Sequence, residues 1–223
     1  MTGIALTRRV LATRDTRWAR RLAHLLHDLG ATPNGVSIAG VGWALAAGAA
    51  LALVPAFDGA GPAIAFAIAA AAIQLRLLCN LLDGMLAVEE GLGTPLGDLY
   101  NEIPDRLADV VILLGAGAAV RNVTGGLALG CGAALAALFT AYIRVLAGSL
   151  GMTQPFIGPM AKQHRMFVLT IAALCAAIEA ALGMPMRALV TGLAIIAAGA
   201  VVTAWRRIAL IAAALEARTS GSE

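Results

Sequence analysis

Six long apolar stretches limit what this chain can fold into, because each of them suits the interior of a lipid bilayer. They cover about residues 36–56, 62–86, 97–120, 127–146, 166–182 and 189–205. Each is close to the roughly 20 residues that an α-helix needs to cross the hydrocarbon core. Charged residues make up only 13% of the chain, and a soluble domain usually has about twice that share. We therefore predict an all-α polytopic membrane protein with six transmembrane helices and no separate soluble domain.

The segment before the first apolar stretch is cationic and amphipathic. Apolar residues such as Trp18 and Leu22 interleave with six arginines, which are Arg8, Arg9, Arg14, Arg17, Arg20 and Arg21. Such a helix lies along the membrane surface, where anionic headgroups attract it, and Thr32-Pro33 marks its end. We predict an amphipathic interfacial segment (1–35), a six-helix membrane domain (36–216) and a tail (217–223). No cleavable signal peptide is expected, because the segment lacks an early apolar core.

The positions of Lys and Arg predict the orientation of the chain. Basic residues gather before the first apolar stretch and after the last one, and the loop between the first two stretches has none. The positive-inside rule then places both termini in the cytoplasm. The Ala-rich composition, with Arg preferred over Lys, is typical of a bacterial inner membrane protein. The basic residues form no stripe, so no nucleic-acid partner is predicted.

Acidic residues concentrate in the region from the end of the second apolar stretch to the first half of the third. Of thirteen in the chain, seven fall in this region: Asp83, Glu89, Glu90, Asp98, Glu102, Asp105 and Asp109. Ionisable groups at the edge of a membrane span are costly and indicate a functional site. Asn80 and Asp83 share one helix face, and Asn101, Asp105 and Asp109 repeat every four residues on the next. We expect the two helices to be antiparallel neighbours whose polar faces meet at the cytoplasmic end.

Several oxygen ligands in one cleft are typical of a site for a hard divalent cation such as Mg²⁺. The simpler interpretation is that these acids pair with Arg106 or stabilise the positive end of a helix. For Glu89 and Glu90, which fall in a loop, the simpler interpretation is preferred. For Asp83 and Asp105 a functional role is preferred.

The same residues resemble a known signature. The run Asn80-Leu-Leu-Asp83-Gly84-Met-Leu-Ala87-Val88, then eight residues, Gly97, Asn101 and Asp105, looks like the D-x2-D-G-x2-A-R-x8-G-x3-D-x3-D pattern of the CDP-alcohol phosphatidyltransferase family. The spacing matches throughout. Asn80, Asn101 and Val88 stand where the family has Asp, Asp and Arg. Thr32-Pro33-Asn34 and Tyr142-Ile143-Arg144 are also similar to segments of the family.

The resemblance implies a function and a set of site residues. A phosphatidyl or phospho-alcohol group would move from a CDP-linked donor to an alcohol acceptor, with release of CMP, in phospholipid synthesis. The implied metal is Mg²⁺ or Mn²⁺, and a homodimer is possible. The implied metal ligands are Asn80, Asp83, Asn101 and Asp105, and Asp105 would also be the catalytic base. The implied nucleotide-binding residues are Asn34, Asp83, Gly84, Ala87 and Gly97. The implied acceptor-binding residues are Arg144, Lys162 and Arg165. Arg76, one turn before Asn80, either replaces the missing Arg or forms an interhelical salt bridge.

Two alternatives remain open at this point. The two Asn residues and Val88 are compatible with a descendant of the same fold that binds a CDP-linked lipid without turnover. A small ion transporter would instead use the acidic cleft as an ion path, but a transport path has its polar groups near the midplane of the membrane, whereas these acids lie at one edge.

Overall fold

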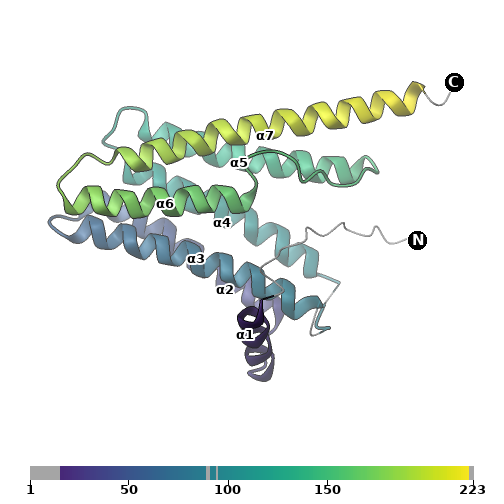
Figure 1. The fold of residues 1–223 in the computed structure, drawn as a ribbon, viewed down its shortest axis with the longest axis horizontal. Coiled ribbons are helices and arrows are strands. Elements are labelled where there is room, and N and C mark those ends of the chain that lie inside the picture. The colour runs from purple at the N-terminus through teal and green to yellow at the C-terminus, as the bar shows by residue number, and fades with distance from the viewer. Residues whose placement is uncertain (1–15, 89–90, 94, 221–223) are drawn as a thin grey trace.

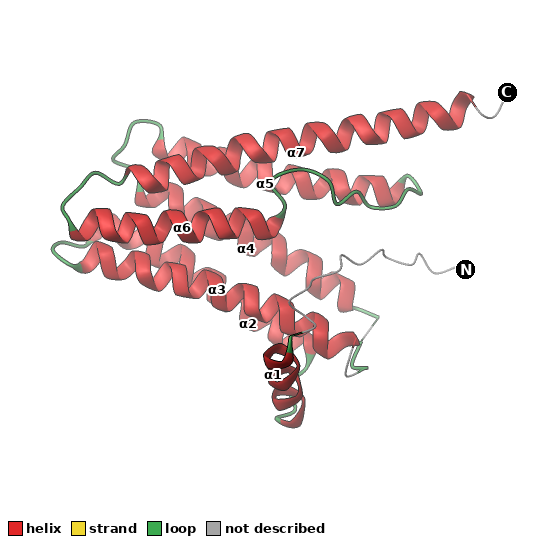
Figure 2. Cartoon of the chain, viewed as in Figure 1, coloured by secondary structure: helices red, strands yellow, loops and turns green. Residues whose placement is uncertain are grey.

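The computed structural model describes residues 16–88, 91–93 and 95–220 (Figure 1). Within this part the chain is helical and no strand is present, as the cartoon in Figure 2 shows. The helices are α1 (Arg17–Asp28), α2 (Pro33–Leu53), the 3-10 helix η2 (Val54–Ala56), α3 (Gly61–Val88), α4 (Gly97–Ala119), α5 (Gly126–Ser149), α6 (Lys162–Ala181) and α7 (Arg187–Ser220).

Helices α2 to α7 correspond to the six predicted apolar stretches, which confirms the all-helical fold class. Five of them, all but α4, are long and apolar enough to cross a membrane. Helix α4 has 23 residues but carries Glu102, Asp105, Arg106 and Asp109 within them, so the count of six spans stays a prediction. The last helix continues to Ser220, well beyond residue 205, so the segment predicted as a tail begins inside α7.

The packing order differs from the expected one at α3 and α4. These two helices, although consecutive, barely touch each other, and α2 packs closely against both. Helix α3 has α6 as its other main neighbour, and α4 has α5, while α7 packs on α5 and α6. The expectation that α3 and α4 would be close neighbours was therefore wrong for their backbones. Polar side chains of α3 and α4 nevertheless meet through hydrogen bonds, as the sequence predicted for their polar faces.

Glycine explains why α2 lies so close to α4. A Cβ added to Gly115 would sit 2.8 Å from Cα of Gly48, and one added to Gly48 would sit 2.6 Å from a methyl group of Val111. The two backbones approach to a distance that any side chain would prevent, as is common between helices in membranes. A similar contact joins Gly117 of α4 to Gly130 of α5.

Helix α1 packs across the end of α3. Its Ala19 and Ala23 are buried against Leu81, Leu82 and Met85, while Arg17, Arg20 and Arg21 are exposed. This two-sided character agrees with the amphipathic helix predicted from the sequence. Figure 1 shows α1, the end of α3, the start of α4 and the end of α7 at the same end of the bundle. Arg8, Arg9 and Arg14 lie outside the described residues.

The loop before α6 is fixed to α7 by hydrogen bonds. The Thr203 hydroxyl accepts a bond of 2.9 Å from the backbone N–H of Met160, and Arg207 donates to the carbonyl oxygens of Ile157 (3.1 Å) and Thr140 (2.6 Å). Gly158 has a φ of +112° and lies directly on Thr203. Together these contacts set where α6 begins, and therefore where Lys162 lies.

Candidate functional site

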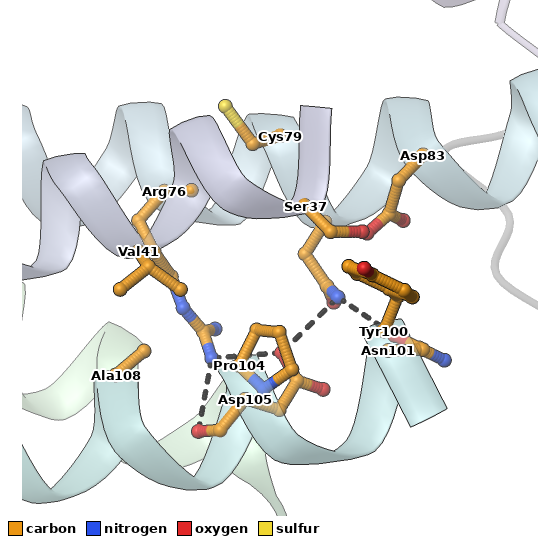
Figure 3. A pocket seen from close by; sticks show the side chains of 12 residues that line it. Ser37, Val41, Arg76, Cys79, Asp83, Tyr100, Asn101, Pro104, Asp105 and Ala108 are labelled. Atoms are coloured by element: carbon orange, nitrogen blue, oxygen red, sulfur yellow. Dashed lines mark hydrogen bonds and ion pairs between the residues drawn. The ribbon is translucent and has the colours of Figure 1, made fainter. Parts of the chain in front are cut away.

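Four signature positions, Asn80, Asp83, Asn101 and Asp105, were predicted to form one site. Three of them meet through direct hydrogen bonds between α3 and α4. The Asn80 side-chain amide donates 3.3 Å to Oδ1 of Asn101 and 3.2 Å to Oδ1 of Asp105. The fourth position, Asp83, lines the same small cavity (Figure 3). The structure thus brings together the four residues that the sequence predicted as one site.

Asp83 is held by a residue that the sequence analysis did not connect with the site. Ser37, in the second turn of α2, donates a hydrogen bond of 2.7 Å to Oδ2 of Asp83, and both side chains are buried. Thr32 caps α2 by accepting a bond of 3.1 Å from the N–H of Gly35. The cap and Pro33 fix the helix start, and so place Ser37 against α3. The signal in the sequence was too weak, because 46 residues separate Ser37 from its partner.

Cations from α3 and α6 surround Asp105 and Asp109 of α4. Arg76 of α3 contacts Asp105 at 3.0 Å and Asp109 at 3.5 Å, which is the interhelical salt bridge considered above. Arg165 of α6 binds Asp109 at 2.6 Å. Lys162, one turn before Arg165, binds Oδ2 of Asp105 and donates 2.5 Å to Oδ1 of Asn80. Each carboxylate is therefore compensated at close range, as buried charges require.

The three cations predicted for the acceptor each bind a different acid of α4. Arg144 pairs with Glu102 and lies over the ring of Phe156, Lys162 pairs with Asp105, and Arg165 pairs with Asp109. Glu102 also accepts from Arg106 at 2.9 Å. Arg165 is only 2% exposed, so its guanidinium is buried in the bundle beside Asp109. The acceptor role of these residues stays a prediction.

Four residues predicted for the nucleotide lie on the helices that form the cavity but do not line it. Asn34 lies in the first turn of α2, Gly84 and Ala87 in the last turns of α3, and Gly97 at the start of α4. None of these four is among the residues that line the cavity, whereas Cys79, Tyr100 and Pro104 are. The cavity volume is about 10 Å³, which is room for about one water. A ligand at this site must therefore displace some of the contacts within it.

The donor set does not fit a divalent cation in this arrangement. Such an ion requires several oxygen ligands, usually with carboxylates among them. Both oxygens of Asp105 already accept from cations or from an amide, and one oxygen of Asp83 accepts from Ser37. Asn80 and Asn101 contribute no charge. Among the described residues no group of three His, Cys, Asp or Glu side chains is placed to hold a metal.

A second, apolar groove lies between α4 and α5. Its volume is about 530 Å³, and it is lined mainly by apolar side chains such as Ile103, Leu135 and Phe139. The polar residues Glu102 and Arg106 also line it. The groove therefore combines a long apolar wall with charges that are one turn away from Asp105.

The fold and the site define a helical membrane protein with a charge-paired polar site at one end of its bundle. The structures that it resembles include three of phosphatidylinositol phosphate synthase from Mycobacterium tuberculosis. With the form that has CDP-DAG bound, the TM-score is 0.73 at 23% identity, over 88% of this chain and 94% of that one. With the form in complex with manganese and citrate, it is 0.71 at 22% identity, over 86% and 88%.

The apo form of the same synthase gives a TM-score of 0.68 at 22% identity, over 84% of this chain and 93% of that one. Identity at this level shows a shared fold. No family model matches the sequence, and no curated protein matches it either.

Proposed function

We propose that this protein transfers a phosphatidyl or phospho-alcohol group from a CDP-linked donor to an alcohol acceptor, with release of CMP, in phospholipid synthesis. The observation that carries the proposal is the combination of fold and site. The chain shares the fold of a synthase whose structure holds CDP-DAG, and Asn80, Asp83, Asn101 and Asp105 line one cavity of that fold. A lipid-linked donor is supported by the apolar groove, because α4 lines both the groove and the cavity.

The reaction needs a base and a cationic surface for the donor. The acceptor oxygen attacks the phosphorus that carries the transferred group, the bond from that phosphorus to the CMP oxygen breaks, and the acceptor proton goes to a base. Asp105 is the proposed base, because it is the buried carboxylate at the centre of the site. Arg76 and Lys162, both in contact with Asp105, are the nearest cations for the diphosphate.

The remaining predictions from the resemblance belong to this proposal. The similar synthase structure in complex with manganese supports a divalent cation at Asn80, Asp83, Asn101 and Asp105. Against it, carboxylate oxygens at these positions already accept hydrogen bonds from neighbouring side chains. No step is therefore assigned to a metal. We propose that Asn34, Gly84, Ala87 and Gly97 surround the nucleotide. The cytoplasmic termini, the inner-membrane location and the homodimer are proposed on the resemblance and the charge pattern alone.

A second candidate function is binding of a CDP-linked lipid without turnover. The surroundings of Asp105 favour this function, because Arg76 and Lys162 both contact this carboxylate. Both of its oxygens already accept hydrogen bonds from a cation or an amide, so they are not open to an acceptor hydroxyl. Turnover then requires that one of the two cations moves away.

CMP release from CDP-diacylglycerol, measured with purified protein and pooled acceptor alcohols, tests the choice. The transferase predicts release that Asp105→Asn lowers by about 100-fold or more, the usual contribution of a positioned base. The matched control is Asp58→Asn, which changes an exposed acid in the loop before α3, at the opposite end of that helix. Retained CDP-diacylglycerol binding without CMP release from any acceptor would instead establish the binding protein.

A further inference from the structure

Lys162 is the only lysine in the chain, since the remaining basic residues are arginines. It lies in the candidate site, and its side chain is 20% exposed. The loop that precedes it is tied to α7 through Thr203 and Arg207. A single ammonium group is thus placed among oxygens from α3 and α4 by a rigid support.

The contacts of Lys162 resemble those of a bound metal ion. Its Nζ donates to Oδ1 of Asn80 and to Oδ2 of Asp105, which are oxygens of two of the four signature positions. The orientation of the Asn80 amide is consistent with this role. Its carbonyl oxygen faces the ammonium, and its NH₂ group faces the oxygens of Asn101 and Asp105. A reversed amide would direct its NH₂ group at the ammonium and lose all three bonds.

The charges of the site balance without any further cation. Three buried carboxylates, Asp83, Asp105 and Asp109, lie with three cations, Arg76, Lys162 and Arg165. In the site without donor, a divalent cation would leave two uncompensated positive charges among largely buried groups, which is costly. Two more carboxylates, at Asn80 and Asn101, would supply the two missing negative charges. The amides at these positions therefore suit an ammonium and disfavour a divalent cation.

We propose that Lys162 takes the place of a divalent cation, so that this site binds the diphosphate of a CDP-linked donor without metal. The inference rests on the proposed function and names how its donor is recognised. Ammonium groups bind phosphate well as point charges. When the diphosphate enters, Lys162 donates to it and leaves Oδ2 of Asp105. That oxygen is then open to the acceptor hydroxyl, so donor binding frees the base.

The first test is binding of CDP-diacylglycerol to purified protein in nanodiscs, with EDTA or with Mg²⁺. We expect the dissociation constant of the wild type to differ by less than about twofold between the two conditions. Lys162→Met should weaken binding by about 10-fold or more in both, because a charge-assisted hydrogen bond is lost. The matched control is Arg187→Met, which removes an exposed positive charge at the start of α7, beyond the other end of α6 from Lys162. Binding that requires Mg²⁺ would overturn the inference and leave the proposed function intact. No binding in either condition would overturn both.

A second measurement uses the wild-type chain and does not depend on the folding of a variant. Reductive methylation modifies amines, so Lys162 is its only side-chain target, and mass spectrometry of the peptide that contains it gives the labelling rate. CDP-diacylglycerol in EDTA should slow this rate at least about threefold, since the ammonium then binds phosphate. Equal labelling with and without the lipid, in a preparation that binds it, would refute a role for Lys162.

The complementary variant is Asn80→Asp combined with Asn101→Asp. It restores two carboxylates, and we expect it to gain a thermal stabilisation by Mn²⁺ that the wild type lacks, because a ligand that binds only the folded state raises its stability. A wild type that Mn²⁺ stabilises as strongly as this variant would contradict the charge argument.

Discussion

Removal of Arg165 should destabilise the whole bundle. Its guanidinium binds Asp109 at 2.6 Å and the Met160 carbonyl oxygen at 3.0 Å, and both charged side chains are 2% exposed. Arg165→Met leaves Asp109 with Arg76, which is farther away at 3.5 Å. The loss of one partner from a buried pair costs about 3–5 kcal/mol. We expect the lower value, about 3 kcal/mol, because Arg76 still offsets part of the Asp109 charge.

The assay is equilibrium unfolding in mixed detergent micelles, followed by circular dichroism. The double variant Arg165→Met with Asp109→Leu serves as the control, because it removes both charges of the pair. It should recover part of the loss, since a buried ion pair replaced by apolar residues is often neutral in stability. A loss below about 1 kcal/mol in Arg165→Met, together with a raised KM for the acceptor, would show that Arg165 binds substrate and would refute the structural role.

Two further substitutions test other parts of the structure. Gly115→Val should lower the free energy of unfolding by about 2 kcal/mol or more, since overpacking costs about 1–3 kcal/mol. The new side chain would collide with the α2 backbone, 2.8 Å from its Cβ. The control in the same unfolding assay is Gly132→Val, whose new Cβ meets nothing within 4 Å. Ser37→Ala should weaken CDP-diacylglycerol binding severalfold, because Asp83 loses the 2.7 Å hydrogen bond from the Ser37 hydroxyl. Unchanged affinity would show that the orientation of Asp83 does not matter for binding of this lipid.

The sequence was sufficient to predict the helices but not their neighbours. Apolar length marks a membrane helix whatever surrounds it, so the six stretches and the six helices α2 to α7 agree closely. Which helices touch depends on a few small residues. Gly48 and Gly115 allow α2 to approach α4, and this approach separates α4 from α3. No periodicity in the chain distinguishes these two glycines from the other glycines of the same helices.

For the site, spacing identified the signature positions and missed their partners. Asn80, Asp83, Asn101 and Asp105 were found because helical repeats place them on facing surfaces. Arg76 was recognised as a candidate for an ion pair, but its two acids, Asp105 and Asp109, depend on how far apart α3 and α4 lie. Lys162 was assigned to the acceptor, since nothing in the sequence shows that the loop before it brings it to Asp105.

The charges of α4 have a consequence for the order in which the chain can enter a membrane. A single Asp or Arg at the centre of a membrane helix costs about 2.5–3.5 kcal/mol on insertion, so α4 is a poor membrane segment by itself. Its acids pair with Arg76, which is synthesised earlier, and with Arg144, Lys162 and Arg165, which are synthesised later. If α4 crosses the bilayer, Asp105 and Asp109 can pair only with Arg76 until α6 leaves the ribosome. The same ion pairs that close the site then complete the topology of the protein, and α4 becomes a stable membrane helix only as the last third of the chain arrives.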